Sequence, residues 1–357
     1  MILFSLRTVL VRMSILFVWL SFIFLFLFSP RITKVFRTEK SIKIFTFPTL
    51  LDADYITAFE RETGIKLYIS YYENNDELLA KLRRTQGGGY DIVMPSDYAV
   101  ELLIKEGLLK KIDTSKLHFF NSIDSQFLSL YFDPGNIYSI PYMWEFYTIG
   151  INTTFFKGNM PDFSWGLIFD KKMINYRVGM VNNAREAVLI AAYYLFGSID
   201  NLTNNKIKQI KKLLIEQKKW VEAYTDLRSD YLLLSGSCPV AVGMSGEIWR
   251  ASRFEKKIDF LIPQEGSFIV LDNIVLPKKR SNKEDLVYAF INYLYRPEVQ
   301  AYHANALSLF PVIEDISLSD YFLNTKKKIK KIKKLEFFKN VLSEKQLHNI
   351  WITLKAN

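Results

Sequence analysis

Short apolar runs alternate with amphipathic segments along the first hundred residues after position 40. The patterns at residues 42–47, 65–71 and 91–94 predict short buried strands. Between them, residues 52–63 predict a helix that begins after Asp52 and ends at Gly64, and a second helix follows Asn74. Strands that alternate with helices in this way indicate an α/β sheet with parallel strand pairs.

Two later stretches are extended, apolar and longer than an ordinary strand. Residues 139–152 and 268–277 flank a second region of alternating strands and helices, and a typical strand has only about 5–6 residues. We therefore predict that both stretches cross between two lobes and act as hinges. The predicted first lobe is 41–150 plus 272–312, and the predicted second lobe is 153–270 plus 313–357.

The N-terminal 40 residues have the layout of an export signal. Arg7 and Arg12 precede the apolar run at 15–28, which Ser29 and Pro30 end. No small-residue cleavage site and no lipid-accepting cysteine follow. Residues 1–40 are thus predicted to be a signal peptide or membrane anchor with a basic spacer. The missing cleavage site favours a retained anchor, and in both cases the body is exported.

The charge of +10 on 357 residues is confined to two segments. One is the N-terminal segment and the other is the tract 326–334, which holds seven lysines; elsewhere acidic residues slightly outnumber basic ones. A nucleic-acid groove is therefore disfavoured. The tract fits either a solvated helical face or contact with an anionic surface, and its role stays open.

Metal, disulfide and catalytic signatures are missing from the sequence. Cys238 is the single cysteine, and the three histidines stand far apart. There is no nucleophile elbow, phosphate loop or zinc-protease motif. We predict a protein that is not an enzyme and that holds no metal or cofactor.

Polar side chains do gather directly after the predicted strands, where ligands bind in open α/β sheets. Asp272 interrupts the second crossing stretch, where a carboxylate is costly unless it is paired. The other candidates follow strands or lie in the first crossing. The predicted ligand-binding residues are Ser96, Tyr98, Glu186, Asp272, Asn183, Glu145, Trp144 and Glu247.

Several segments also resemble the spermidine/putrescine-binding proteins of bacterial ABC importers, which belong to the two-lobed solute-binding class. The matching segments are FERETGIKLYISYYENNDELLAKL, GGYDIVMPSDYAVELLIKEGLLKKID, FDPGNIYSIPYMWEFYTIGIN, NNAREAV, FIVLDNIVLPKK and AFINYLYRPEV. Together they cover roughly residues 41–310 in order. The resemblance implies the two-lobed periplasmic solute-binding protein fold with two hinge crossings.

The resemblance further implies a polyamine in the cleft, bound by acids and by an aromatic box, and delivery to a membrane permease. It assigns ligand contacts to Ser96, Tyr98, Glu186 and Asp272. Two features depart from the family pattern. Asn183 stands where the family usually has an aspartate, and the family's cleft tryptophans fall near Pro48, Met244 and Val270. Another small solute, such as an amino-acid derivative or a peptide, is therefore the alternative ligand. The expected location is the periplasm, with the body anchored to the cytoplasmic membrane.

Overall fold

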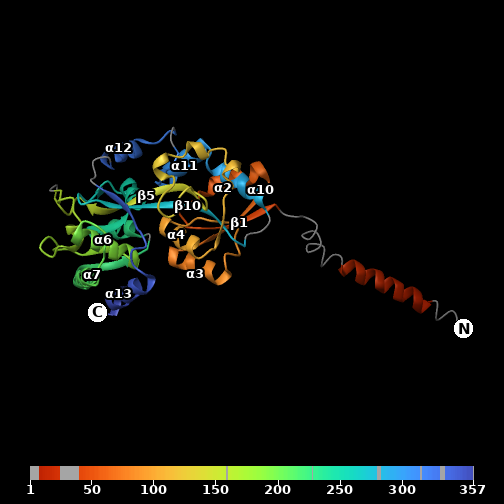
Figure 1. Cartoon of the computed structure of the whole chain (residues 1–357). Coiled ribbons are helices and arrows are strands. Elements are labelled where there is room, and N and C mark those ends of the chain that lie inside the picture. Colours follow the sequence, from red (N-terminus) through yellow and green to blue (C-terminus); the bar gives the residue numbers. More distant parts are fainter. Residues whose placement is uncertain are drawn as a thin grey trace.

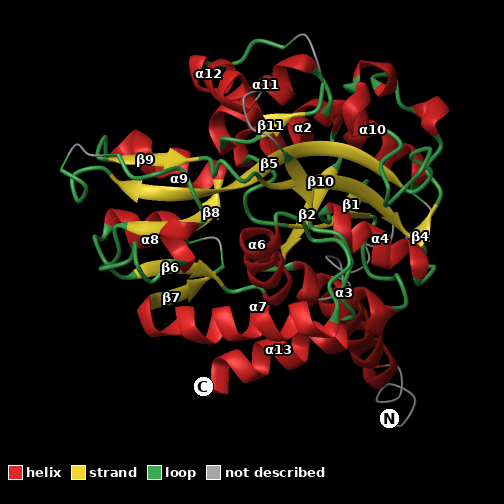
Figure 2. Ribbon diagram, turned by 60° about the vertical axis from the view of Figure 1, so that its left-hand side comes forward, coloured by secondary structure: helices red, strands yellow, loops and turns green. Residues whose placement is uncertain are grey.

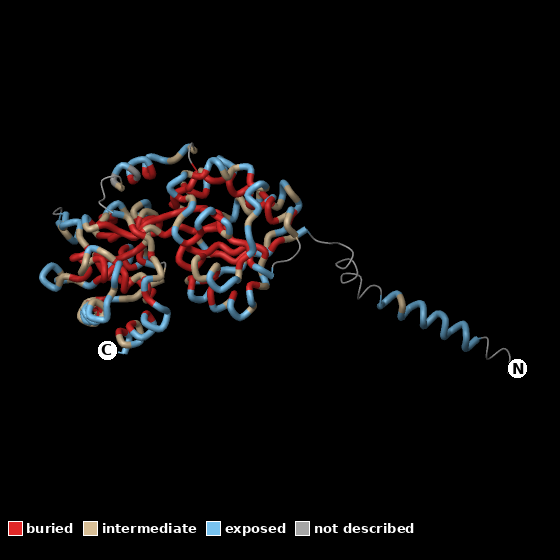
Figure 3. The backbone as a smooth tube through the Cα atoms, viewed as in Figure 1, coloured by how far each residue is buried: buried red, intermediate tan, exposed pale blue. Residues whose placement is uncertain are grey.

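The computed structural model describes residues 8–24, 40–157, 160–226, 228–279, 283–313, 316–329 and 334–356. Two α/β lobes lie side by side, and long strands run from one to the other (Figure 1). Buried apolar residues from Ile42 to Leu354 form one core cluster, and buried positions occupy the interior of both lobes (Figure 3). The predicted two-lobed α/β fold is confirmed.

The first lobe is built on parallel strands in the order β2-β1-β3. Its helices begin and end where the sequence predicts: Asp52 accepts a hydrogen bond from the Asp54 amide, and Gly64 ends α2 at φ 69°. Because only the glycine tolerates this left-handed conformation without strain, the chain can turn directly into β2. The elements are β1 (Ser41–Thr46), α2 (Ala53–Thr63), β2 (Lys66–Tyr71), α3 (Asn75–Thr85), β3 (Ile92–Val93), α4 (Asp97–Lys105), β4 (Leu109–Lys110), and the 3₁₀ turns η1 (Thr114–Lys116), η2 (Phe120–Ser122) and η3 (Ser125–Phe127).

The two crossing stretches are single long strands that pair with each other. Strand β5 (Ser139–Asn152) runs antiparallel to β10 (Ser267–Pro277), with Glu145 opposite Val270 and Met143 opposite Asp272. From Tyr147 onward β5 pairs instead with strands of the second lobe. This pair of strands therefore joins the two sheets (Figure 2). The predicted lobe boundaries near 150 and 272 stay a prediction.

The second lobe carries parallel strands β6, β7 and β8, with β9 against β5. Helix α6 is apolar almost all round because it is covered on its outer side as well, by α7 and α13 (Figure 2). The elements are α5 (Gly166–Phe169), β6 (Val178–Val181), α6 (Ala184–Phe196), α7 (Asn204–Gln217), η4 (Lys218–Trp220), β7 (Val221–Thr225), α8 (Ser229–Leu234), β8 (Val240–Met244), α9 (Ser245–Phe254) and β9 (Ile258–Leu261).

The C-terminal part of the chain contacts both lobes. Helix α13 packs on α6 and α7, while its Glu344 pairs with Arg83 of α3 at 2.8 Å. Helix α13 therefore connects the two lobes on their outer side. The elements are α10 (Glu284–Leu294), α11 (Pro297–Leu307), β11 (Phe310–Pro311), α12 (Asp320–Ile329), β12 (Leu335–Phe337) and α13 (Glu344–Ala356).

Only part of the predicted N-terminal segment 1–40 is described. Residues 8–24 form a helix that is exposed apart from a partly exposed Ser21 (Figure 3), and the segments 1–7 and 25–39 lie outside the described residues. Within the described part of the chain, no helix combines the length and apolar character needed to cross a membrane. Residues 330–333 of the lysine tract also lie outside the described residues.

Candidate functional site

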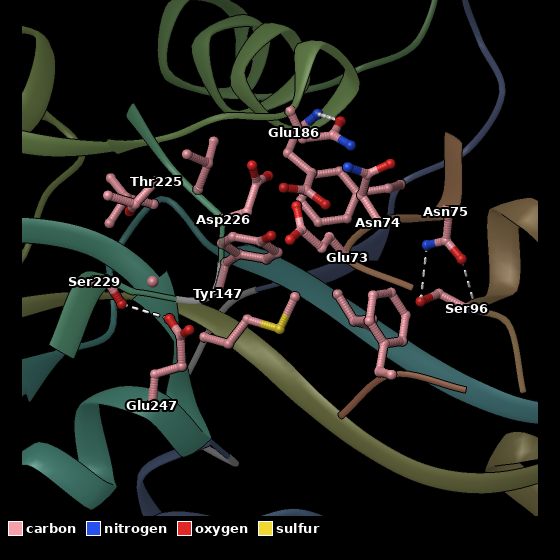
Figure 4. A pocket seen from close by; sticks show the side chains of 18 of the residues that line it. Glu73, Asn74, Asn75, Ser96, Tyr147, Glu186, Thr225, Asp226, Ser229 and Glu247 are labelled. Atoms are coloured by element: carbon pink, nitrogen blue, oxygen red, sulfur yellow. Dashed lines mark hydrogen bonds between the residues drawn. The ribbon is translucent and has the colours of Figure 1, made fainter. Parts of the chain in front are cut away.

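The ends of several strands meet at a cleft between the lobes, which contains two neighbouring cavities. The larger one, here called the main chamber, is surrounded by strand ends and helix N-termini of both lobes (Figure 4). The smaller one, the side chamber, lies against the crossing strands. Phe47, Ser96, Met244 and Val270 line both chambers, so the two lie side by side.

Acidic side chains surround this space from every direction. The main chamber is lined by Glu73, Asp97, Glu186, Asp226 and Glu247, and the side chamber by Glu145 and Asp272. Figure 4 shows Glu73, Glu186 and Asp226 around Tyr147. Among the described residues that line the two chambers, none is Lys, Arg or His. The cleft therefore favours the binding of a positively charged ligand.

The crossing strands present one face to the cleft. Glu145 and Val270 are paired across the strands, and Tyr147 and Asp272 each lie two residues further along. Because side chains alternate along a strand, these four lie on the same face. Trp144 points to the other face, where its indole stacks on Phe310 with centroids 4.6 Å apart. Trp144 lines neither chamber, because neighbouring residues of a strand point to opposite faces and Glu145 takes the face toward the cleft.

Asp272 is held by a short chain of hydrogen bonds from the first lobe. The Asn75 side-chain amide donates to Ser96 Oγ at 3.1 Å, and Ser96 Oγ donates to Asp272 Oδ1 at 3.0 Å. Asp97, in the first turn of α4, accepts the Leu271 amide at 3.0 Å on Oδ2. These contacts fix the second crossing strand against the N-terminus of α4 and leave the carboxylates poorly solvated.

The N-terminus of α6 supplies the second-lobe side. Asn183 caps this helix: its side-chain oxygen accepts the amides of Arg185 and Glu186 at 2.9 and 3.2 Å. Glu186, half-buried, accepts a hydrogen bond from the Tyr147 hydroxyl. The Arg185 guanidinium lies over the Tyr98 ring of the first lobe at 4.7 Å, so the two lobes touch beside the main chamber.

Glu247 and Glu145 face the cleft from α9 and β5. Ser229 Oγ donates to Glu247 Oε2 at 2.5 Å, and the Gly246 amide donates to Glu145 Oε2 at 3.2 Å. Ser229 can reach this position because Gly243 has no side chain: a Cβ there would lie 2.0 Å from Ser229 Oγ. Glu247 Oε1 is buried and has no hydrogen-bond partner in the described structure.

Burial perturbs the ionisation of five cleft carboxyls. It raises the pKa of each to about 7, and neighbouring acids add to the rise at all of them except Asp97. Single hydrogen bonds, such as those from Ser96 and Ser229, oppose it only in part. The five are Asp97, Glu145, Glu186, Glu247 and Asp272. A bound cation would relieve this cost by pairing with the charged forms.

The structure brings together seven of the eight side chains that the sequence predicts for the site. Ser96, Tyr98, Asn183, Glu186 and Glu247 line the main chamber, and Ser96, Glu145 and Asp272 line the side chamber; Trp144 is the exception. The sequence analysis missed Glu73, which lies two residues after the end of β2, and Asp226, which directly follows β7, although a place after a strand was the signal used for the others. It also missed the aromatic residues Phe47, Tyr147 and Phe338.

A metal site is not apparent in the described part of the chain, where no group of three His, Cys, Asp or Glu side chains is arranged to hold an ion. The acids of the cleft are divided between two cavities, five around the main chamber and two around the side chamber. This arrangement suits a ligand with more than one positive centre.

Two lobes, two crossing strands and an acidic cleft between strand ends are the features of a solute-binding protein. Residues 54–331 match the family described as bacterial extracellular solute-binding protein, and the chain belongs to this family.

Named relatives are similar over most of the chain. The putrescine-binding periplasmic protein SpuD of Pseudomonas aeruginosa is 31% identical over 74% of this chain and 76% of its own length. The spermidine/putrescine-binding periplasmic protein of Escherichia coli K12 is 35% identical over 68% of both chains. A solved structure from Listeria monocytogenes has a TM-score of 0.77 at 26% identity, covering 88% of this chain and 99% of that one.

Proposed function

We propose that this protein is the substrate-binding component of an ABC importer and that it captures polyamines outside the cytoplasmic membrane for delivery to the permease. The observation that carries the proposal is the ring of seven carboxylates around a cleft whose described lining includes no basic side chain. The names of the relatives from Pseudomonas and Escherichia support the same ligand class.

The cleft offers each part of a polyamine a matching surface. Each ammonium group needs a carboxylate partner once it leaves water, because an unpaired buried charge costs several kcal/mol. The methylene segments need apolar contact, which Phe47, Met244 and Val270 supply between the acidic ends. Tyr98 and Tyr147 add ring surfaces that can also attract ammonium groups.

Ligand capture is proposed to proceed by closure of the lobes about the crossing strands. Closure would bring Glu186 and Glu247 of the second lobe toward Ser96 and Asp272 of the first, so that one ligand contacts both lobes. The closed form would then dock on the permease.

Calorimetric titration of the full-length protein in detergent micelles tests the ligand assignment. Putrescine and spermidine should bind, and amino acids such as arginine and short peptides should not. Native mass spectrometry of the purified protein should show a co-purified amine of matching mass. A co-purified peptide or amino-acid derivative, with no polyamine binding, would replace the proposal with the alternative solute.

Replacing Glu186 with Gln should weaken polyamine binding by about tenfold, since it removes one carboxylate while keeping the shape of the side chain. The effect should be smaller than that of a fully buried acid because Glu186 is half-buried and partly solvated. The helix itself should lose only about 0.3–1 kcal/mol, because a first-turn acid interacts with the helix dipole. Titration calorimetry with putrescine measures the change. An unaltered dissociation constant would remove Glu186 from the site.

We further propose that the body is periplasmic and that the N-terminal segment is retained as its membrane anchor. The motivation is the apolar run at 15–28 without a small-residue cleavage site. Cell fractionation should place the protein with the cytoplasmic membrane, and N-terminal sequencing should find the segment intact. A mature N-terminus between residues 31 and 41 would show instead that the segment is a cleaved signal.

A further inference from the structure

The chain contacts the two lobes in turn after β12. Strand β12 pairs with the start of β10, where Phe268 packs on Tyr193 of α6 in the second lobe with ring centroids 5.5 Å apart. Residues 338–344, here called the strap, then contact the first lobe, and α13 returns to pack on α6 and α7 of the second lobe. The strap and α13 thus join the lobes at a place separate from the pairing of the crossing strands.

Helix α13 lies on the side of the cleft away from the crossing strands, here called the mouth of the cleft. Figures 1 and 2 both show α13 and the strands β5 and β10 on opposite sides of α6. A groove with about 520 Å³ of free space lies at the mouth, between α3, the N-terminus of α6 and α13, and Asn183 lines both this groove and the main chamber. Lobes that open about the crossing strands separate most at the mouth.

Helix α13 is attached to the second lobe along its length. Its buried residues Leu347, Ile350 and Leu354 recur on one face, and the helix packs on α6 and α7. Lys218 Nζ donates to the carbonyls of Leu354 and Lys355 at 3.1 and 2.9 Å. This side chain therefore satisfies two of the carbonyls that a helix C-terminus leaves open. We expect α13 to move with the second lobe.

Polar side chains attach the strap to the first lobe. Asn340 Nδ2 donates to the Tyr98 carbonyl at 3.1 Å and to Glu101 Oε2 at 2.5 Å, both on α4. At the other end of the strap, Glu344 accepts two hydrogen bonds from Arg83 of α3, at 2.8 and 3.3 Å. The side chains of Arg83 and Glu344 are 37% and 53% exposed, so water can replace this ion pair at a small cost. The pair can therefore form and break as the lobes move.

The Arg83 guanidinium binds two carboxylates, one on each side of the mouth. Its Nε and Nη2 donate to Glu106, which follows α4 in the first lobe, at 3.0 and 2.7 Å. Its Nη1 and Nη2 donate to Glu344 of α13. Because Glu106 already fixes the guanidinium within the first lobe, little further ordering is needed when Glu344 approaches. Only the bond to Glu344 changes when the lobes separate.

We propose that the strap holds the mouth of the cleft closed and that the Arg83–Glu344 ion pair is its releasable contact. When the lobes come together, the second lobe brings α13 to α3 and the pair forms. When the lobes open about the crossing strands, the pair breaks. Its free energy therefore shifts the equilibrium toward the closed form, with or without ligand. The strap thus slows ligand release although Arg83 and Glu344 line neither chamber.

Single-molecule energy transfer between the lobes of the ligand-free, full-length protein in detergent micelles tests the proposal. Dyes on Ala289→Cys of α10 and Lys212→Cys of α7 report the separation, since both positions are exposed and the native Cys238 is buried. Glu344→Gln should raise the ratio of open to closed molecules by about two- to fivefold, the range for an exposed ion pair. Glu106→Gln is the matched control, because it removes an equal charge from the same guanidinium within the first lobe. It should not raise the ratio. An unchanged ratio in Glu344→Gln would overturn the proposal.

Reversing the polarity of the pair separates its electrostatic effect from a general loss of packing. Glu344→Arg places two guanidinium groups together, so the ratio of open to closed molecules should rise at least as much as in Glu344→Gln. Adding Arg83→Glu should return the ratio to within about twofold of wild type, because one guanidinium again lies between two carboxylates. A double variant that stays as open as Glu344→Arg would contradict the proposal.

The release of putrescine, followed by stopped-flow fluorescence, provides a second measurement. Glu344→Gln should release putrescine about two- to fivefold faster than the wild-type protein, and Glu106→Gln should release it no faster. Equal release rates in Glu344→Gln and wild type would contradict the proposal. A wild-type protein that binds no amine would instead contradict the proposed function, and the energy-transfer measurement without ligand would still decide whether the strap holds the lobes together.

Discussion

Replacing Asp272 with Asn should weaken polyamine binding by about 2–5 kcal/mol, the usual range for removing one partner of a buried charge pair. That corresponds to a loss of about 30-fold to several thousand-fold in affinity. The effect should be large because Asp272 is 4% exposed, so water cannot replace the lost carboxylate. Asparagine keeps the side-chain shape and can still accept the hydrogen bond from Ser96.

The same variant should be at least as stable as the wild-type protein when no ligand is present. Burial raises the pKa of Asp272 to about 7, with Asp97 adding to the rise, so the neutral amide removes a charge that the empty cleft holds at a cost. Calorimetric titration with putrescine and thermal unfolding without ligand separate the two effects. The control is Glu298→Gln, which removes an exposed acid of α11 and changes the net charge equally. Wild-type affinity in Asp272→Asn would exclude Asp272 from the site.

Polyamine affinity should rise steeply with pH between about 5.5 and 7.5. The pKa of five cleft carboxyls is raised to about 7, chiefly by burial, so at lower pH they are neutral and cannot pair with ammonium groups. A bound polyamine favours the charged forms and therefore lowers their pKa, so binding releases protons. Affinity should change by about tenfold per pH unit for each carboxyl that must ionise.

The stability of the ligand-free protein should change in the opposite direction. A carboxyl whose folded-state pKa is raised above its unfolded value contributes stability that is fully present below the unfolded value, near 4, and is lost as the pH rises through 7. The five cleft carboxyls thus make the empty protein less stable at pH 7.5 than at pH 5.5. Buried His303, whose pKa is lowered to about 4 by burial, opposes this trend, but it is one group against five.

Two measurements check this pH dependence. Titration of putrescine at pH 6.5 in buffers with different ionisation enthalpies should report net proton release. Thermal unfolding at pH 5.5 and 7.5 should show a lower midpoint at pH 7.5 without ligand, and saturating putrescine should stabilise the protein more at pH 7.5. Affinity that stays flat over this range, with no proton release, would mean that the cleft acids are already ionised in the empty protein.

Much of the fold follows from local pattern. The sequence predicts Asp52, Gly64 and Asn74 as helix ends from their neighbours, because capping is satisfied within a few residues. The two crossing strands were predictable from their length and apolar character alone. The pattern of polar residues after strands predicts Ser96, Glu186 and Glu247 as ligand contacts, because the strand ends of an α/β sheet meet at one edge.

The faces of the crossing strands could not be predicted in this way. Every residue of β5 from Ser139 to Ile151 is buried, so both faces are covered and the sequence shows no alternation of apolar and polar positions. Glu145 and Trp144 were therefore equally plausible as ligand contacts. Packing decides between them: Phe310 covers the face of Trp144, and the cleft lies on the face of Glu145.

The class of fold, the two crossings and most of the acids that face the cleft are predictable from the sequence, since each depends on short-range periodicity or on a residue's place at a strand end. The tertiary structure alone decided the shape and charge of the binding space. Phe338 reaches the main chamber from the C-terminal segment, and the side chamber depends on the small Val270 standing opposite Glu145. Such features arise from contacts between residues far apart in the chain, and the free energy of a buried charge depends on everything that surrounds it.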